Sequence, residues 1–199
     1  MGDIGKIFGG LTGKSKTDFT NGNSRFVTYM NVFNNLAVDT NRTDFVKIGA
    51  SEHQRTLQKG DIIFTGSSET PEEVGMSSVV TTDVKEPIYL NSFCIGYRLS
   101  DTSIMDPEFS KHLFRSEEIR TQIVRTASGV TRFNVSKVRL AAVRVPILDL
   151  MEQKKIATIL DQFDALVNDI SIGLPAEIKA RRQQYEHYRD RLLTFKEAA

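Results

Sequence analysis

The clearest hydrophobic pattern of the chain lies near its C-terminus, in residues 146–195. Five apolar side chains recur there at steps of three and four, the a/d spacing of a coiled coil: Ile156, Ile159, Phe163, Leu166 and Ile170. The stripe continues after Pro175 and extends to Phe195. A stripe this narrow predicts a helix that another helix covers. The residues expected at that contact are Ile156, Ile159, Leu160, Phe163, Leu166, Ile170, Ile178, Tyr185, Tyr188 and Leu192.

The segment Gly173-Leu174-Pro175 interrupts this helical pattern. Proline lacks a backbone N–H donor and clashes with the preceding turn, so it kinks or ends a helix. Pro175, followed by Glu177, is equally suited to the first turn of a new helix. Two alternatives stay open: one kinked helix from Leu150 to Phe195, about 70 Å long at 1.5 Å per residue, or two helices separated by a break.

The first 147 residues show a different pattern, with short β-branched and aromatic runs separated by turn residues. After a short opening strand, these runs predict strands at Phe26–Phe33, Phe45–Ile48, Ile62–Thr65, Ser78–Thr82, Ile88–Leu90, Phe93–Leu99 and Val138–Val145. Helices are predicted to start at Asp106-Pro107 and at Ser116 and to end by Ser128-Gly129. The polar residues between Gly66 and Ser78 predict a long loop, of a length that is typically functional or mobile.

These elements predict an α+β fold. Residues 1–147 form a strand-rich globular domain with one helical insertion, because the uneven spacing of the strands does not fit regular βαβ alternation. Residues 148–199 form a helical region.

Composition narrows the functional class. Hydrophobic residues make up 40% of the chain and charged residues 26%, which is normal for a soluble globular protein. No apolar run approaches the roughly 18 residues of a membrane span, so no membrane partner is predicted. The single cysteine, Cys94, excludes an internal disulfide framework and suits the reducing cytoplasm, where we expect it to be a small buried residue.

No motif of an enzyme or of a metal site is present. The three histidines lack metal-ligand spacing with a second histidine or cysteine. The segment Gly9–Ser15 approaches a phosphate-binding loop, but that motif requires a glycine five positions before Gly13, where Phe8 stands. We therefore reject a nucleotide-using enzyme and expect a flexible basic loop there. A binding module fits the sequence better.

Charge is segregated along the chain although the net charge is only +1. Residues 111–144 carry eight Lys or Arg, including Arg115, Arg120 and Arg125, against two Glu. This permits a basic face that binds DNA phosphates, with Asn, Arg and Lys side chains available for base edges; the simpler alternative is a set of solvated surfaces. The candidate DNA-binding residues are Lys14, Lys16, Asn21, Asn23, Arg25, Tyr29, Asn31, Asn34, Ser67, Ser68, Thr131, Arg132, Asn134 and Lys137.

Several motifs together resemble the specificity subunit of type I restriction–modification systems. They are the opening Gly2-Asp3-Ile4, the strand entry Lys59-Gly60-Asp61-Ile62-Ile63, the turn at Ser128-Gly129 that precedes Pro146, the run Glu152–Leu160 (EQKKIATIL) and the final GLPAEIKARRQQYEHYRDRLLTF. The similarity extends over essentially the whole chain.

The resemblance implies that residues 1–147 are a target-recognition domain for one half of a bipartite DNA site. Residues 148–199 would then be a spacer that docks methyltransferase (modification) subunits, with restriction subunits joining the same assembly. The family's specificity subunit catalyses nothing and has no cofactor of its own, because S-adenosylmethionine, ATP and Mg²⁺ belong to the partner subunits. A typical member has two recognition domains and two helical regions, whereas this chain has one of each. We therefore expect a homodimer through antiparallel C-terminal helices. The alternative is a coiled-coil adaptor that does not bind DNA.

Overall fold

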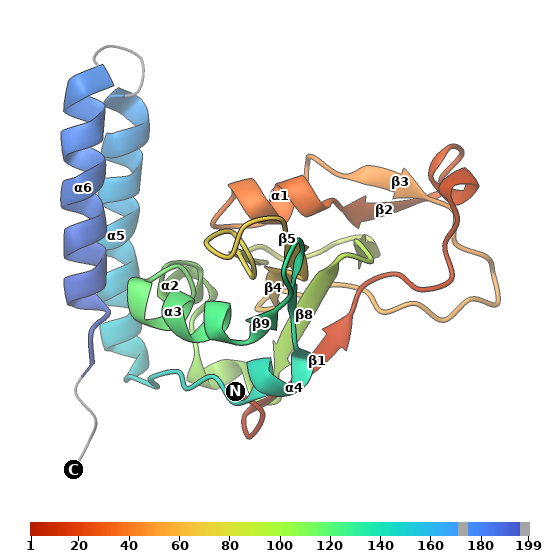
Figure 1. Cartoon of the computed structure of the whole chain (residues 1–199), viewed down its shortest axis with the longest axis horizontal. Helices are drawn as coiled ribbons and strands as arrows, with labels where there is room; N and C mark the ends of the chain where they lie inside the picture. Colours follow the sequence, from red (N-terminus) through yellow and green to blue (C-terminus); the bar gives the residue numbers. More distant parts are fainter. Residues whose placement is uncertain (171–174, 196–199) are drawn as a thin grey trace.

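The computed structural model describes the backbone of residues 1–170 and 175–195, and the side chains of residues 1–167 and 179–195. A strand-rich body is followed by two long helices, α5 (Leu150–Ile170) and α6 (Pro175–Leu192), which lie side by side and run antiparallel (Figure 1). Short strands and helices follow one another without regular alternation, which confirms the predicted α+β class. The division of the chain into domains at residue 147 stays a prediction.

The largest sheet has four antiparallel strands in the order β1 (Gly5–Gly9), β8 (Cys94–Leu99), β4 (Ile62–Thr65) and β6 (Ser77–Val79). The inner strand β4 is buried along its whole length. Its side chains enter two separate cores, because successive residues of a strand point to opposite faces. Ile62 and Phe64 belong to the main core, whereas Ile63 belongs to a second core with Phe8 and Val27.

Two smaller sheets flank the central one. The first has the strand order β3 (Asp44–Val46), β2 (Ser24–Val27) and β7 (Ile88–Leu90), in which β2 and β7 are parallel. The second has the order β5 (Ser67–Ser68), β10 (Phe133–Val135) and β9 (Ala127–Ser128). This pairing places residues 67–68 against residues 133–134, which are distant in the sequence.

Four short α-helices complete the body: α1 (Tyr29–Asn34), α2 (Pro107–Leu113), α3 (Glu117–Arg125) and α4 (Lys137–Ala141). Two single-turn helices, η1 (Lys16–Phe19) and η2 (Thr102–Ile104), lie in connecting segments. Helix α2 begins as predicted, with the Asp106 carboxylate accepting hydrogen bonds from the backbone of Glu108 and Phe109. Phe109 and Leu113 extend the main core from the sheet to α5.

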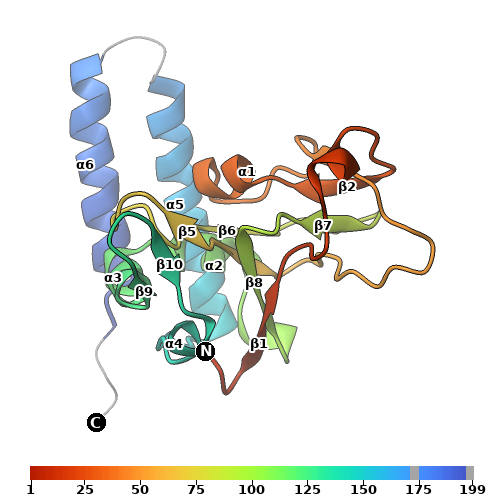
Figure 2. The same ribbon diagram turned by 45° about the vertical axis from the view of Figure 1, so that its right-hand side comes forward.

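The apolar stripe of the C-terminal region is covered within the chain itself. Ile156 and Leu160 of α5 are buried in the main core, and Tyr185 of α6 joins them there. Farther along, the rings of Phe163 and Tyr188 stack with centroids 5.6 Å apart. The two helices therefore form a helical hairpin, as Figure 2 shows from a second direction.

Of the two alternatives left open by the sequence, the broken helix is correct for the described residues, and one continuous long coiled-coil helix is wrong. Among the side chains predicted for the stripe contact, Ile156, Leu160 and Tyr185 are buried. Ile159, Phe163 and Leu192 are partly buried, whereas Leu166 and Tyr188 are exposed (51% and 37%). The side chains of Ile170 and Ile178 lie outside the described residues.

Two residues of the motifs that carry the resemblance have structural roles here. Asp61 of the Lys-Gly-Asp-Ile-Ile run is fully buried and binds Arg98 through two hydrogen bonds of 2.6 and 2.7 Å. Gln153 of the EQKKIATIL run is also fully buried, and its amide donates to the carbonyls of Ile104 and Leu148 while accepting from the backbone N–H of Asp106. Both side chains connect elements that are far apart in the chain.

Two strand predictions need correction. The segment Phe26–Phe33 is a strand only up to Val27, because the Thr28 hydroxyl accepts a hydrogen bond from the Asn31 backbone and starts α1. The segment Val138–Val145 contains helix α4 in place of a closing strand, because Ser136 caps it in the same way and the buried Leu140 anchors one helical face. The predicted loop Gly66–Ser78 is held in place by β5 and β6 at its two ends.

Candidate nucleic-acid interface

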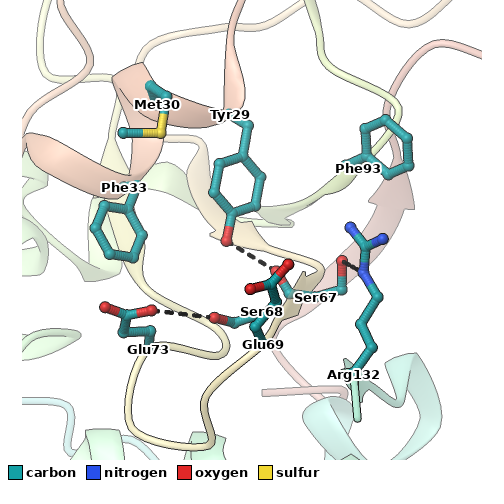
Figure 3. Close-up of a pocket in the computed structure, with 9 residues that line it drawn as sticks. All are labelled: Tyr29, Met30, Phe33, Ser67, Ser68, Glu69, Glu73, Phe93 and Arg132. Atoms are coloured by element: carbon teal, nitrogen blue, oxygen red, sulfur yellow. Dashed lines mark hydrogen bonds between the residues drawn. The ribbon is translucent and has the colours of Figure 1, made fainter.

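A cleft of about 420 Å³ opens where α1, β5 and the hairpin of β9 and β10 meet (Figure 3). Its lining combines aromatic, hydroxyl, acidic and basic side chains, namely Tyr29, Met30, Phe33, Ser67, Ser68, Glu69, Glu73, Phe93 and Arg132. A concave, partly apolar site with a few polar groups is the usual form of a ligand-binding site.

Helix α1 provides the aromatic wall of the cleft. Tyr29 and Phe33 are four residues apart, so they lie on the same face of the helix, and their rings stack with centroids 6.1 Å apart. The Tyr29 hydroxyl donates a hydrogen bond of 2.8 Å to the backbone carbonyl of Ser67. Burial raises the pKa of Tyr29, which keeps this hydroxyl protonated and able to donate.

Strand β5 and the segment after it form the polar floor. The hydroxyl of Ser68 donates to the Glu73 carboxylate at 3.3 Å. The Glu69 carboxylate accepts no hydrogen bond from any described residue, and in Figure 3 it points into the cleft beneath Tyr29. One acceptor in this floor is therefore available to a ligand.

Arg132 closes the cleft on the opposite side. It lies on the connection between β9 and β10, which also contains the strongly exposed Val130 (92% exposed). The Nε of Arg132 donates to the Ser67 hydroxyl at 3.3 Å, and its guanidinium lies 5.9 Å from the centre of the Phe93 ring. Its two terminal nitrogens donate to no described residue.

Two other arginines hold the walls of the cleft in place. Arg115 donates to the carbonyls of Val32 and Phe33 in the last turn of α1 and to Ser77. Helix ends leave such carbonyls without partners, and a cation there also suits the helix dipole. Arg120 donates to the carbonyls of residues 72, 74 and 75, next to Glu73.

Burial lowers the pKa of each of these guanidinium groups to about 10, so both stay charged at neutral pH. The prediction that Arg115 and Arg120 contribute to an exposed basic face is therefore wrong. Both arginines have structural roles.

The cleft unites four of the predicted DNA-binding residues: Tyr29, Ser67, Ser68 and Arg132. Three more are exposed on the adjoining hairpin and on α4, namely Thr131, Asn134 and Lys137. The Asn134 amide donates to the carbonyl of Arg132 and so supports the loop that carries it. Because β5 pairs with β10 and Arg132 lines the cleft, the cleft and this hairpin form one surface.

The other predicted residues do not join this surface, and several are occupied by structural contacts. Lys14 is bound to Glu52 and to the carbonyl of Lys47, Asn23 is bound to the backbone of Ile48, and Arg25 donates to Thr43 and to the carbonyl of Thr40. Asn31 is buried and holds the chain at Asp39 and Arg42. Lys16, Asn21 and Asn34 are exposed but do not line the cleft.

Five cleft residues were missed by sequence reasoning: Met30, Phe33, Glu69, Glu73 and Phe93. A signal existed for Phe33, which lies one helical turn after Tyr29 once α1 is recognised as a helix. In the sequence the two glutamates are indistinguishable from ordinary solvated residues of the polar Gly66–Ser78 loop. They are suited to donors on the bases.

The described residues contain no group of three or more His, Cys, Asp or Glu that could hold a metal ion. Burial raises the pKa of Cys94 to about 12, which confirms a buried, unreactive thiol there. Among the helices that the structure describes, none is long and apolar enough to cross a membrane.

Comparisons with known proteins agree with the fold and with the sequence motifs. Residues 1–180 match the family described as type I restriction modification DNA specificity domain. The chain is 30% identical over 199 residues to the specificity subunit of the type I restriction enzyme EcoR124I/EcoR124II of Escherichia coli, and the match covers 98% of this chain and 47% of that protein. A putative type I specificity subunit of Haemophilus influenzae is 29% identical over 138 residues, which are 69% of this chain and 33% of that protein.

Solved structures show the same fold. The HsdS subunit of Thermoanaerobacter tengcongensis aligns with a TM-score of 0.56 at 18% identity, over 95% of this chain and 44% of that one. The S subunit of a type I restriction–modification system from M. genitalium aligns with a TM-score of 0.51 at 16% identity, over 85% of this chain and 39% of that one. The chain thus spans about half the length of the relatives it matches. Because the family match extends over most of its residues, the chain belongs to the type I restriction–modification DNA specificity family.

Proposed function

We propose that this chain recognises one half of a bipartite DNA target and positions modification and restriction subunits on it. The observation that carries the proposal is the continuous surface formed by the cleft and the adjoining exposed hairpin. The connection between β9 and β10 projects Thr131 and Arg132 outward, and Lys137 lies exposed just after it. A projecting loop with donors can enter a groove, while a neighbouring cation binds phosphate.

The helical hairpin fits the second part of the proposal. Part of it packs on the body, but exposed faces of α5 and α6 carry polar and charged side chains such as Lys154 and Gln183. These faces are where we expect a methyltransferase subunit to dock. The chain itself would be non-catalytic, with S-adenosylmethionine, ATP and Mg²⁺ bound by the partner subunits.

A homodimer remains part of the proposal, but its basis has changed. The stripe is covered inside the chain, so an uncovered seam no longer supports pairing. What supports it is Leu166, an apolar residue of α5 that is 51% exposed and that a second copy would cover, and this copy would supply a second recognition domain.

Salt-dependent DNA binding tests the proposal. Fluorescence anisotropy with a mixed-sequence labelled duplex should show an affinity that falls steeply with salt, because each neutralised phosphate contributes about 0.9 to the logarithmic slope. Lys137→Gln should reduce that slope by about 1, whereas Lys155→Gln, a matched control on exposed α5, should leave it unchanged.

Absence of binding to any duplex would favour the alternative of an adaptor without DNA-binding activity. An affinity that does not vary with salt would equally contradict the assignment of Lys137 to phosphate contact.

A further inference from the structure

The shape of the cleft distinguishes it from a surface that reads a DNA groove. Groove recognition requires an element that projects into the duplex, and the β9–β10 connection with the exposed Val130 is such an element. The cleft beside it is concave, with Glu69 and Arg132 among its polar groups (Figure 3). A base that stays stacked in a duplex has both faces covered and its Watson–Crick edge paired, so it cannot fill a concave site with its ring and that edge. A base that has left the stack can.

The walls of the cleft suit a flat ring. Met30 and Phe93 are exposed at its rim, and Phe33 lies on the aromatic wall with Tyr29. Aromatic side chains bind unstacked bases by stacking, largely irrespective of base identity. Phe93 is 59% exposed although it is a large apolar residue, so a stacking partner would remove apolar surface from water.

Two polar groups of the cleft select among the bases. Glu69 provides an acceptor and Arg132 provides two terminal nitrogens as donors, and no described residue satisfies either set. Cytosine and adenine each have an amino donor next to a ring-nitrogen acceptor on the Watson–Crick edge. Thymine has no amino group on that edge, and its central ring position is a donor.

We propose that this cleft binds one unstacked nucleobase whose Watson–Crick edge has an amino donor next to a ring-nitrogen acceptor, cytosine or adenine, as the protein engages DNA. The Glu69 carboxylate accepts from the exocyclic amino group, Arg132 donates to the ring nitrogen, and Phe93 stacks on the ring. The inference rests on the proposed DNA-binding function and deepens it.

Duplexes with identical flanks and one central unpaired nucleotide provide the test, since an unpaired base leaves the stack at little cost. Anisotropy titrations compare a cytosine, an adenine and a thymine bulge with the fully paired duplex. The wild-type protein should bind the cytosine and adenine bulges about tenfold more tightly than the thymine bulge, as expected for a hydrogen bond to a charged group.

Two pairs of variants assign that preference to the cleft. Glu69→Ala should abolish the preference for the amino-bearing bases, whereas Glu72→Ala should keep it, because only the backbone carbonyl of Glu72 is engaged, by Arg120. Phe93→Ala should weaken every bulged duplex by about tenfold without affecting the paired one. Phe45→Ala, which removes a similarly exposed ring (54%) outside the cleft, should change neither.

Equal affinity for the three bulges, or a loss in Phe93→Ala that is the same for the paired duplex, would overturn the inference while leaving DNA binding intact. A protein that binds no duplex at all would refute the inference and the proposed function together.

Discussion

His112 joins the strand-rich body to both helices of the hairpin, and its environment predicts how the stability of the protein depends on pH. The imidazole is fully buried on α2. Its Nε2 lies 2.6 Å from a carboxylate oxygen of Asp161 on α5, and its Nδ1 lies 3.2 Å from the hydroxyl of Tyr185 on α6. A neutral ring satisfies both contacts, since Nε2–H donates to the carboxylate while Nδ1 accepts from the hydroxyl.

Burial lowers the pKa of His112 below its usual 6.5, although the nearby Asp161 acts in the opposite direction. The unfolded chain therefore binds a proton near pH 6.5 that the folded chain does not bind. Stability is fully present above pH 6.5 and falls as pH decreases toward the lower folded pKa. Between pH 7.5 and 5.5 the largest loss from one such group is about 1.4 kcal/mol. The pKa of Asp161 is itself lowered from 3.8, so its own contribution is lost only in more acidic solution.

Urea unfolding at pH 5.5, 6.5 and 7.5, followed by circular dichroism, measures this loss. The wild type should lose up to about 1.4 kcal/mol more than His112→Gln across this range. His53→Gln and His187→Gln replace exposed histidines and should keep the wild-type pH dependence. The reasoning fails if His112→Gln retains the same slope, or if the wild type becomes more stable as pH decreases.

Three further predictions concern the core, the cleft and the oligomer. Leu160→Ala should lower the free energy of unfolding by about 2–5 kcal/mol in urea unfolding, because Leu160 is fully buried. A variant as stable as the wild type would contradict the packing of α5 on the body. Arg115→Met should lower the free energy of unfolding by about 3 kcal/mol or more in the same assay. Several carbonyls then lose a charged hydrogen-bond donor, and each loss destabilises the protein by about 1–3 kcal/mol. Leu166→Asp should convert a dimeric wild type to a monomer in light scattering without unfolding it, because Leu166 is 51% exposed, whereas a monomeric wild type would end the homodimer proposal. Phe163 is unsuitable for that test, because it stacks on Tyr188 within the chain.

Periodicity predicted the C-terminal helices well but not what covers them. The a/d spacing of Ile156, Leu160 and Phe163 requires a neighbouring helix, and it carries no information on whether that helix belongs to the same chain. The answer depends on the packing of α6 against α5 and on burial against α2, which bring together residues such as His112 and Tyr185 that are far apart in sequence. Between Phe26 and Phe33 the strand prediction failed because the helix cap at Thr28 outweighed the local strand propensity.

The candidate site was predictable only in part, because the same types of polar side chain can either face a ligand or hold the backbone in place. Asn31 and Arg25 were candidates for base recognition, yet both hold backbone carbonyls inside the body. Arg132, another candidate, does line the cleft, and its terminal nitrogens donate to no described residue. Pairing between β5 and β10 placed Arg132 beside Ser67, and sequence patterns do not specify that pairing.

Different residues hold the cleft in place and form its exposed surface. This separation affects how the family can diversify. Arg115 and Arg120 fix the walls from behind through backbone carbonyls, whose positions do not depend on the side chains in front. Met30, Glu69 and Phe93 face solvent, where substitutions typically change stability by no more than about 0.5 kcal/mol. Residues of this surface can therefore be substituted during evolution while the backbone behind them keeps its structure. A change of DNA preference would then require few mutations and little loss of folding free energy.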